Sequence, residues 1–172
     1  MNQHFELRKL RLSDAKSLAE NANNIHIWNN LYDAFPHPYS EEDGIEFIKM
    51  RLDKSDISVH FAIAVDDKVV GGISIIPQEN ISLRIVAEMG YWLGEKYWNK
   101  GIMTEAIKQM VSYAFTNLPH LRKIFATPFD FNIGSQKVLE KAGFEREAIL
   151  KQGAIKNGKI VDLHYYSIIK QD

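Results

Sequence analysis

The chain has 172 residues, 45% of them hydrophobic, and its 21 basic and 22 acidic side chains give a formal net charge of −1. This length fits one domain, residues 1–172, with an ordinary buried core. Because the charges are mixed without a basic stripe, nucleic acid is not an expected partner. The lack of cysteine excludes disulfides, a cysteine nucleophile and thiolate metal sites. The start has no signal-peptide pattern, and no apolar run approaches the roughly 20 residues of a membrane helix. We therefore expect a cytoplasmic protein without membrane association.

The N-terminal third predicts one strand followed by helices. Ser13-Asp14 offers an N-cap to apolar residues at helical spacing, and Ser40 with Asp43 is typical of a capping box. We expect a strand at residues 5–10 and helices at 15–22, 25–31 and from Ser40 to near Lys54.

The rest of the chain predicts strands that increasingly alternate with helices. We expect two strands over 59–76 around a turn at Asp66-Asp67-Lys68, a strand at 84–93, a helix from about 102 to 114, a strand at 123–127, a helix at 135–142 that stops at Gly143, and two strands around the Asn157-Gly158 turn. This order favours a mixed α/β fold with helices on both faces of one sheet, rather than a doubly wound parallel sheet.

The segment 88–106 runs from a strand through a loop into a helix. A helix that begins near Gly101 leaves several backbone N–H groups without an internal partner, and its dipole adds positive character. Such a helix end attracts phosphate, and Gly101 has no Cβ to block the approach, while Lys100 adds a charge. A glycine that only eases the turn is the alternative.

The segment 130–144 also lies between a strand and a helix. Asn132 and Ser135 are residue types that favour helix N-caps. From the residues alone, either capping or a catalytic role is open.

Taken together, the two segments resemble the GNAT superfamily, and most closely its RimJ/RimL-type N-acetyltransferases. Gly90-Tyr91-Trp92-Leu93, followed by residues 98–106, is similar to the strand and loop that bind acetyl-CoA in that branch. Asn132-x-x-Ser135 with residues 138–144 is similar to its second motif, and Gly158, Asp162 and Tyr166 fit its closing hairpin. The resemblance implies a mostly antiparallel central sheet and covers nearly the whole chain, with a looser match in the N-terminal third.

The resemblance implies acetyl-CoA as cofactor and free coenzyme A as product. The sequence departs from the general Gln/Arg-x-x-Gly-x-Gly/Ala pattern of the superfamily, because Trp98 and Met103 occupy the first and last of these positions. Backbone N–H groups do not depend on side-chain identity, so binding is still expected. The implied cofactor-binding residues are Tyr91, Trp92, Leu93, Trp98, Asn99, Lys100, Gly101, Ile102, Met103, Thr104, Asn132 and Lys137.

Acetyl transfer to an amine requires a base, a donor to the oxyanion and a proton for the thiolate. Strand parity puts Glu88 beside the space that Gly90 leaves open, so Glu88 is the candidate base, with an ordinary solvated or ion-paired carboxylate as the alternative. The resemblance implies that a backbone N–H near residues 91–93 is the oxyanion donor. The resemblance implies Ser135 as the acid, and Tyr166 is a competing proton donor.

Aromatic side chains gather on and around a proline-stiffened loop in the N-terminal third, and they are candidates for the wall of an amine pocket or for ordinary core residues. They are Trp28, Tyr32, Phe35, His37 and Tyr39. No histidine or carboxylate cluster has ligand spacing, so no metal is expected.

Two other functions compete with N-acetyl transfer. A phosphotransferase would use the same helix N-terminus, but the chain lacks the Gly-x-x-x-x-Gly-Lys-Ser/Thr motif. A non-catalytic acyl-CoA-binding module of the same fold is the second alternative. The acceptor is expected to be a primary amine, on a peptide N-terminus or a small molecule, and the protein to be a monomer or a homodimer.

Overall fold

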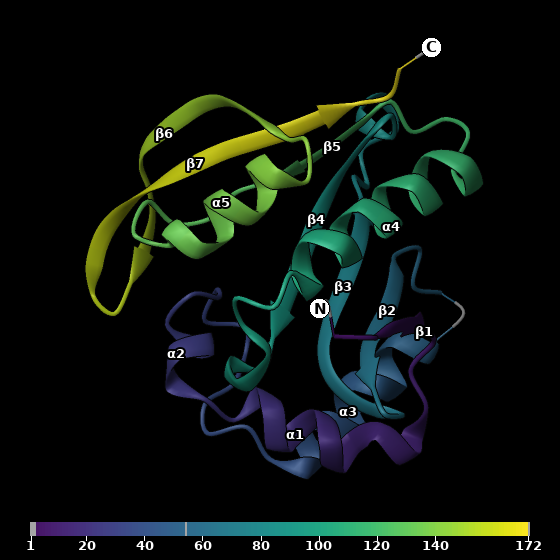
Figure 1. Ribbon diagram of the computed structural model, residues 1–172. Coiled ribbons are helices and arrows are strands. Elements are labelled where there is room, and N and C mark those ends of the chain that lie inside the picture. The colour runs from purple at the N-terminus through teal and green to yellow at the C-terminus, as the bar shows by residue number, and fades with distance from the viewer. Residues whose placement is uncertain (1–2, 54, 172) are drawn as a thin grey trace.

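The computed structural model describes residues 3–53 and 55–171. It contains a seven-stranded sheet with strands from both the N-terminal and the C-terminal parts of the chain. Its strands are β1 (Glu6–Arg8), β2 (Val59–Val65), β3 (Lys68–Pro77), β4 (Val86–Leu93), β5 (Lys123–Ala126), β6 (Glu145–Lys156) and β7 (Lys159–Ile169). They stand in the order β1-β2-β3-β4-β5-β7-β6, and among the described residues only β4 and β5 pair in parallel (Figure 1). The prediction of a mixed α/β fold with a mostly antiparallel sheet is confirmed.

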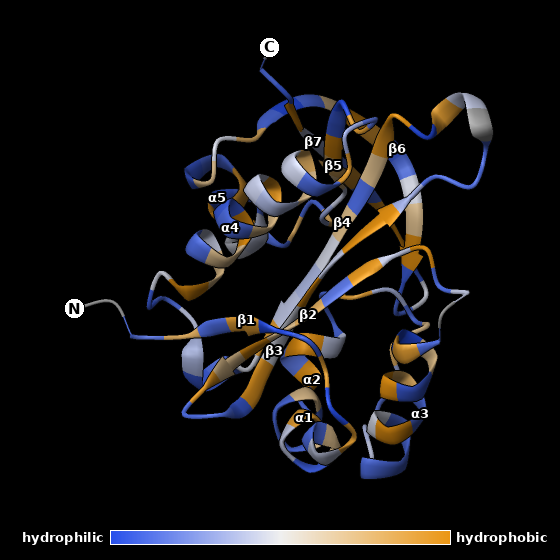
Figure 2. Ribbon diagram, turned by 90° about the vertical axis from the view of Figure 1, so that its right-hand side faces the viewer, coloured by the Kyte–Doolittle hydropathy of each residue, from blue (hydrophilic) through white to orange (hydrophobic). Residues whose placement is uncertain are grey.

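Helices cover both faces of the sheet (Figure 1, Figure 2). On one face lie α1 (Ala15–Ala22) and α3 (Glu41–Leu52), and on the other lie α4 (Ile102–Asn117) and α5 (Ile133–Lys141). A single-turn helix, α2 (Ile25–Trp28), and 3₁₀ turns at Leu12–Asp14, Ile81–Leu83 and Glu95–Tyr97 complete the fold. Within the described parts of the chain, no helix is long and apolar enough to cross a membrane.

The periodicity of α4 explains how it attaches to the sheet. Ala106, Ile107, Met110 and Ala114 recur at intervals of three or four residues and are fully buried. Burying a side chain such as Ile107 or Met110 contributes about 1.5–3 kcal/mol. This apolar face fixes the N-terminus of α4, where Gly101 is the N-cap, against the sheet.

Local sequence rules set several boundaries as expected. At the start of α3, the Ser40 hydroxyl accepts from the Asp43 N–H at 3.1 Å, and the Asp43 carboxylate accepts from the Ser40 N–H at 2.8 Å. Asn157 and Gly158 have left-handed φ angles of 52° and 71°, which suit a tight hairpin turn. The helix α3 ends at Leu52, and the end expected near Lys54 lies outside the described residues.

Asp14 differs from the expected helix cap. It occupies the N-cap position of α1, but its side chain makes no capping hydrogen bond. Instead, the carboxylate accepts from the Arg8 guanidinium at 2.8 Å and from the Arg11 N–H at 2.7 Å. Burial would raise the pKa of Asp14, but these two donors hold it below its usual value. The strand β1 ends at Arg8, the residue that forms this buried ion pair, two residues earlier than expected.

The parallel pairing of β4 with β5 is short. It comprises Val86 with Lys123, Ala87 with Ile124 and Glu88 with Phe125. Beyond Glu88, β4 continues to Leu93 while β5 ends at Ala126, and no further β5 partner follows in the described chain. The sheet therefore opens next to Glu88.

Candidate functional site

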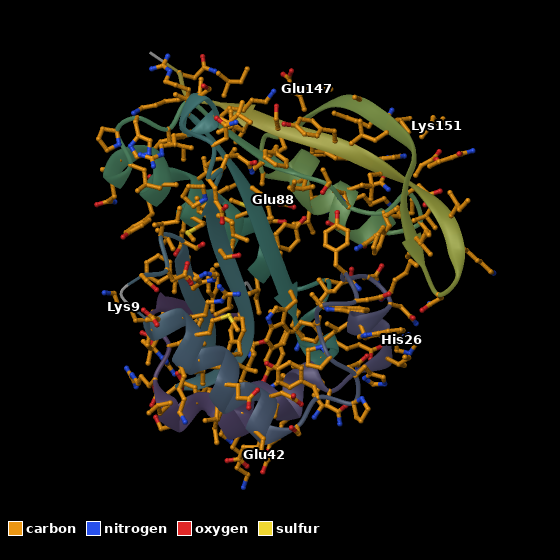
Figure 3. All side chains as sticks on the ribbon, turned by 180° about the vertical axis from the view of Figure 1, so that it is seen from behind. Lys9, His26, Glu42, Glu88, Glu147 and Lys151 are labelled. Carbon is orange, nitrogen blue, oxygen red and sulfur yellow. The ribbon has the colours of Figure 1, made fainter. Side chains whose placement is uncertain are left out.

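A cavity of about 830 Å³ occupies the opening between β4 and β5. Its walls come from four parts of the chain: β4, the turn leading into α4, the segment from β5 into α5, and the segment around the end of α2. Every residue that the sequence assigned to cofactor binding lines this cavity, as do Glu88 and Ser135. Figure 3 labels Glu88 on β4, near the middle of the molecule.

The N-terminus of α4 presents free backbone donors to the cavity. Gly101 precedes the helix with a left-handed φ of 78°, and no side chain caps this end. In the described chain, the N–H groups of Ile102, Met103 and Thr104 have no protein acceptor, and the Glu105 N–H is the first to bond, to the Gly101 carbonyl at 3.2 Å. The helix dipole adds positive potential, so this end suits an anion.

Three exposed lysines are among the residues that line the cavity. Lys100 lies beside Gly101, with its Nζ 5.3 Å from the Tyr97 ring centroid. Lys137 and Lys141 come from α5, one helical turn apart. Lys141 was not among the residues predicted from the sequence, although its i,i+4 spacing from Lys137 was a usable signal.

Trp98 braces the end of β4. Its indole N–H donates to the Leu93 carbonyl at 2.7 Å, so the ring fixes the strand end as well as lining the cavity. This contact gives a structural reason for tryptophan at the position where the general family pattern has a polar residue.

Glu88 is half-buried at the point where β4 leaves β5. Burial raises the pKa of Glu88 above its usual range, although a hydrogen bond from Thr127 partly opposes this. The Tyr32 hydroxyl lies 3.0 Å from the Thr127 hydroxyl. As strand parity predicts, Trp92 shares the face of Glu88 and packs with the cluster under α1 and α3.

Ser135 and Asn132 have different roles, which the sequence left open. The Asn132 side chain accepts from the Ser135 N–H at 3.1 Å and is the N-cap of α5. The Ser135 hydroxyl instead lies 2.6 Å from the Tyr91 hydroxyl. Burial raises the pKa of Tyr91 well above its usual range; the Ser135 hydrogen bond opposes this shift, and Tyr166 adds to it.

Tyr166 lies outside the cavity, which corrects its expected place among the catalytic residues. Its side chain is fully buried, and its hydroxyl donates to the Glu140 carboxylate at 2.8 Å. Tyr166 stands opposite Ala126 in the β5–β7 pairing, under α5, so it is part of the core.

The prediction that five aromatic residues form the wall of an amine pocket also needs correction, because most of them lie outside the cavity. Of these five residues, only Tyr32 lines the cavity. Tyr39 is 5% exposed and packs on Phe35, with ring centroids 5.0 Å apart, in the core beneath α1 and α3. His37 lies against Trp28, 5.9 Å between centroids, and neither reaches the cavity.

The cavity wall near Tyr32 consists mostly of residues that were not predicted from the sequence. They come from the end of α2 and from the loop after β5: Ile27, Asn30, Leu31, Thr127, Phe129 and Phe131. The helix α2 ends at Trp28, earlier than expected, because the chain changes to i→i+3 bonds from Asn30 to Ile27 and from Leu31 to Trp28. Among the described residues, no group of three or more histidines and carboxylates is placed to hold a metal ion.

Comparisons with known proteins agree with this geometry. A family model, the acetyltransferase (GNAT) domain, matches residues 4–145. The putative ribosomal N-acetyltransferase YdaF of Bacillus subtilis (strain 168) is 30% identical over 179 residues, covering 100% of this chain and 94% of that protein. The microcin C7 self-immunity acetyltransferase MccE, solved with acetyl-CoA and AMP, has a TM-score of 0.85 at 23% identity and covers 98% of this chain and 94% of that one. Mycobacterium smegmatis RimJ, solved with CoA-disulfide, has a TM-score of 0.86 at 22% identity, with 98% and 83% covered. The chain belongs to the GNAT acetyltransferase family and is an acetyl-CoA-dependent N-acetyltransferase.

Proposed function

We propose that this protein acetylates a primary amine, on a peptide N-terminus or a small molecule, by direct attack in a ternary complex. The observation that carries the proposal is the opening after Glu88, which joins the two faces of the sheet in one cavity. Glu88 belongs to the face covered by α1 and α3, while Ser135 and Tyr91 belong to the face covered by α4 and α5. The cofactor and the amine can therefore approach from opposite sides.

The free backbone donors of α4 fit the diphosphate of acetyl-CoA, and the three lysines fit its phosphate charges. Bound acetyl-CoA supplies the thioester carbonyl and the thiolate leaving group. The N–H groups of Ile102, Met103 and Thr104 would hold the diphosphate, and Lys100 would add charge at its rim. The edge of β4 beyond Glu88, which does not pair with β5, would align the pantetheine arm and offer a backbone N–H to the carbonyl oxygen.

Glu88 removes a proton from the acceptor amine, directly or through water. A base works best when its pKa lies near the working pH, and burial moves the pKa of Glu88 in that direction. Tyr32 and Thr127 position the carboxylate from the side. A carboxylate in a partly apolar wall also attracts the ammonium form of the amine before deprotonation.

Ser135 donates a hydrogen bond to the leaving sulfur. A phenol is a stronger acid than an aliphatic alcohol, so Tyr91 is the better donor of the two and Ser135 the acceptor in their 2.6 Å contact. This direction leaves the Ser135 hydrogen free to point into the cavity. Because the pKa of Tyr91 is raised, its proton stays in place throughout the neutral pH range.

The choice of acceptor is supported by one relative. YdaF is named as a putative ribosomal N-acetyltransferase, which favours the RimJ/RimL-type branch and a peptide N-terminus as acceptor. Such an acceptor requires a cytoplasmic location, which stays a prediction, as do one functional domain and a monomeric or homodimeric state.

The proposed function is tested with acetyl-CoA and a panel of amines that includes a peptide with a free N-terminal serine, spermidine and free amino acids. We expect mass spectrometry to show a single added acetyl group on one class of amine, with matching release of coenzyme A thiol. If acetyl-CoA binds in calorimetry but no amine in the panel is acetylated, the non-catalytic alternative replaces this proposal.

Glu88→Gln is expected to lower kcat by roughly 100-fold, the usual scale for loss of a general base. A base is active when deprotonated, so the wild-type rate rises with pH through the raised pKa of Glu88. This acidic limb should disappear in Glu88→Gln. Glu105→Gln, on α4 and outside the cavity lining, is the control and should keep the wild-type profile. An acidic limb that persists in Glu88→Gln assigns the base elsewhere.

Ser135→Ala is expected to lower kcat about tenfold while changing the KM for acetyl-CoA by less than about twofold. If Tyr91 acts through Ser135, Tyr91→Phe should slow the wild-type enzyme but have no further effect in the Ser135→Ala background. Tyr113→Phe, an exposed tyrosine of α4, is the matched control. Additive losses in the double variant would separate the two hydroxyls, and a full rate in Ser135→Ala would remove Ser135 from the reaction.

Gly101→Ala is expected to weaken acetyl-CoA binding about tenfold, because a Cβ at a φ of 78° strains the turn that aims the amides at the diphosphate. Gly158→Ala is the matched control. Its φ is 71°, but it lies in the β6–β7 turn, away from the cavity lining. Calorimetry should show equal thermal destabilisation and a loss of affinity in Gly101→Ala alone. Equal affinities in the two variants would contradict the assigned diphosphate site.

A further inference from the structure

Lys156 is buried although the strand that carries it is exposed. It is 2% exposed, and it is the only buried lysine in the described parts of the chain, residues 3–53 and 55–171. The first nine residues of β6, Glu145–Gly153, are all exposed. The Lys156 Nζ lies 2.6 Å from the Asp33 carboxylate and 3.6 Å from the centroid of the Trp28 ring.

Burial of a lysine is unfavourable unless its charge is compensated. Here, Asp33 provides an ion pair and Trp28 provides the face of an aromatic ring, the best partner for a cation–π contact. Asn157 adds a hydrogen bond to Asn29 at 2.9 Å. These contacts connect residues more than 120 positions apart, and the views from front and back show the tip of the β6–β7 hairpin beside α2 (Figure 1, Figure 3).

The segment that Lys156 holds forms part of the cavity wall on its other side. Asn30, Leu31 and Tyr32 lie between the two Lys156 partners in sequence and line the cavity. The Tyr32 hydroxyl contacts Thr127, next to Glu88. A helix of one turn, such as α2, has little stability of its own, so its position depends on contacts with the rest of the protein.

We propose that Lys156 is a positioning residue for the amine acceptor: through Trp28 and Asp33 it fixes residues 29–33 as the acceptor wall beside Glu88. This inference rests on the proposed acetyl transfer at that cavity. Trp28 thus helps to position the acceptor wall although it lies outside the cavity. The tip of the β6–β7 hairpin supports that wall through the Lys156 contacts, and this support is called the brace below. Acetyl-CoA binds at the opposite end, so it should not depend on Lys156.

Lys156→Met keeps the length of the side chain and removes its charge. Hydrogen exchange of the free protein should show the hydrogen-bonded amides of residues 29–31 exchanging at least about tenfold faster, with α4 unchanged. With whichever of the N-terminal serine peptide and spermidine the wild type acetylates, the acceptor KM should rise about tenfold, and the KM for acetyl-CoA should change less than about twofold. Lys156→Arg, which can pair with the same carboxylate and ring, should restore both readings.

Lys151→Met is the matched control, because Lys151 is on the same strand and pairs with Asp162 at 2.7 Å, but its side chain is 76% exposed. It should behave as the wild type. If Lys156→Met fails to fold, Asp33→Asn tests the same contact from an exposed side chain. Unchanged exchange at the amides of residues 29–31, or an unchanged acceptor KM, in the folded variant overturns the proposal. A wild type that acetylates no amine defeats the proposed function instead, and the exchange experiment still reports on the brace.

Discussion

The early end of the β4–β5 pairing is the constraint on which the site depends. Two parallel strands cannot be joined by a tight turn, so α4 forms the crossover between β4 and β5. The buried face of α4 fixes the position of the N-terminus of this helix. After Glu88 the strands diverge, which exposes the edge of β4 and opens a passage through the sheet. One irregularity thus places a carboxylate, a free strand edge and a helix N-terminus around a single cavity. A continuous parallel pair would have closed it.

The same opening explains why the two halves of the molecule need other contacts. Three paired positions join β4 to β5, and the C-terminal strands depend on that junction. Side-chain contacts around the cavity also connect the halves. They include Tyr32 with Thr127, Tyr91 with Ser135, and Lys156 with Trp28 and Asp33. A cavity that lies between two halves has a shape set by such contacts, so residues outside its lining can influence what it accepts.

Patterns within short stretches of sequence predicted much of the fold. Which side chains pack together from distant parts of the chain could not be predicted in this way. The α4 periodicity, the Ser40 capping box and the Asn157-Gly158 turn each depend on residues close in sequence, and all were found. The turn around Gly101 was recognised through a family resemblance that includes its neighbours. By contrast, Tyr32 and Tyr39 belong to the same aromatic stretch of the sequence, and only the packing of distant segments places one at the cavity and the other in the core. The buried Lys156 carried no signal, because lysine is normally exposed.

The arrangement of charge in the cavity matters more than the net charge of the chain. A formal charge of −1 suggests no electrostatic preference for any ligand. Inside the cavity, however, charges of both signs come from different elements: the lysines come from the α4 turn and α5, and Glu88 comes from β4. In the proposed function, this separation would orient an anionic cofactor and a cationic amine differently before any specific contact forms. The wall that residues 30–32 form beside Glu88 adds apolar surface. In the proposed function, the amine would therefore be held by one charge and by the shape of that wall.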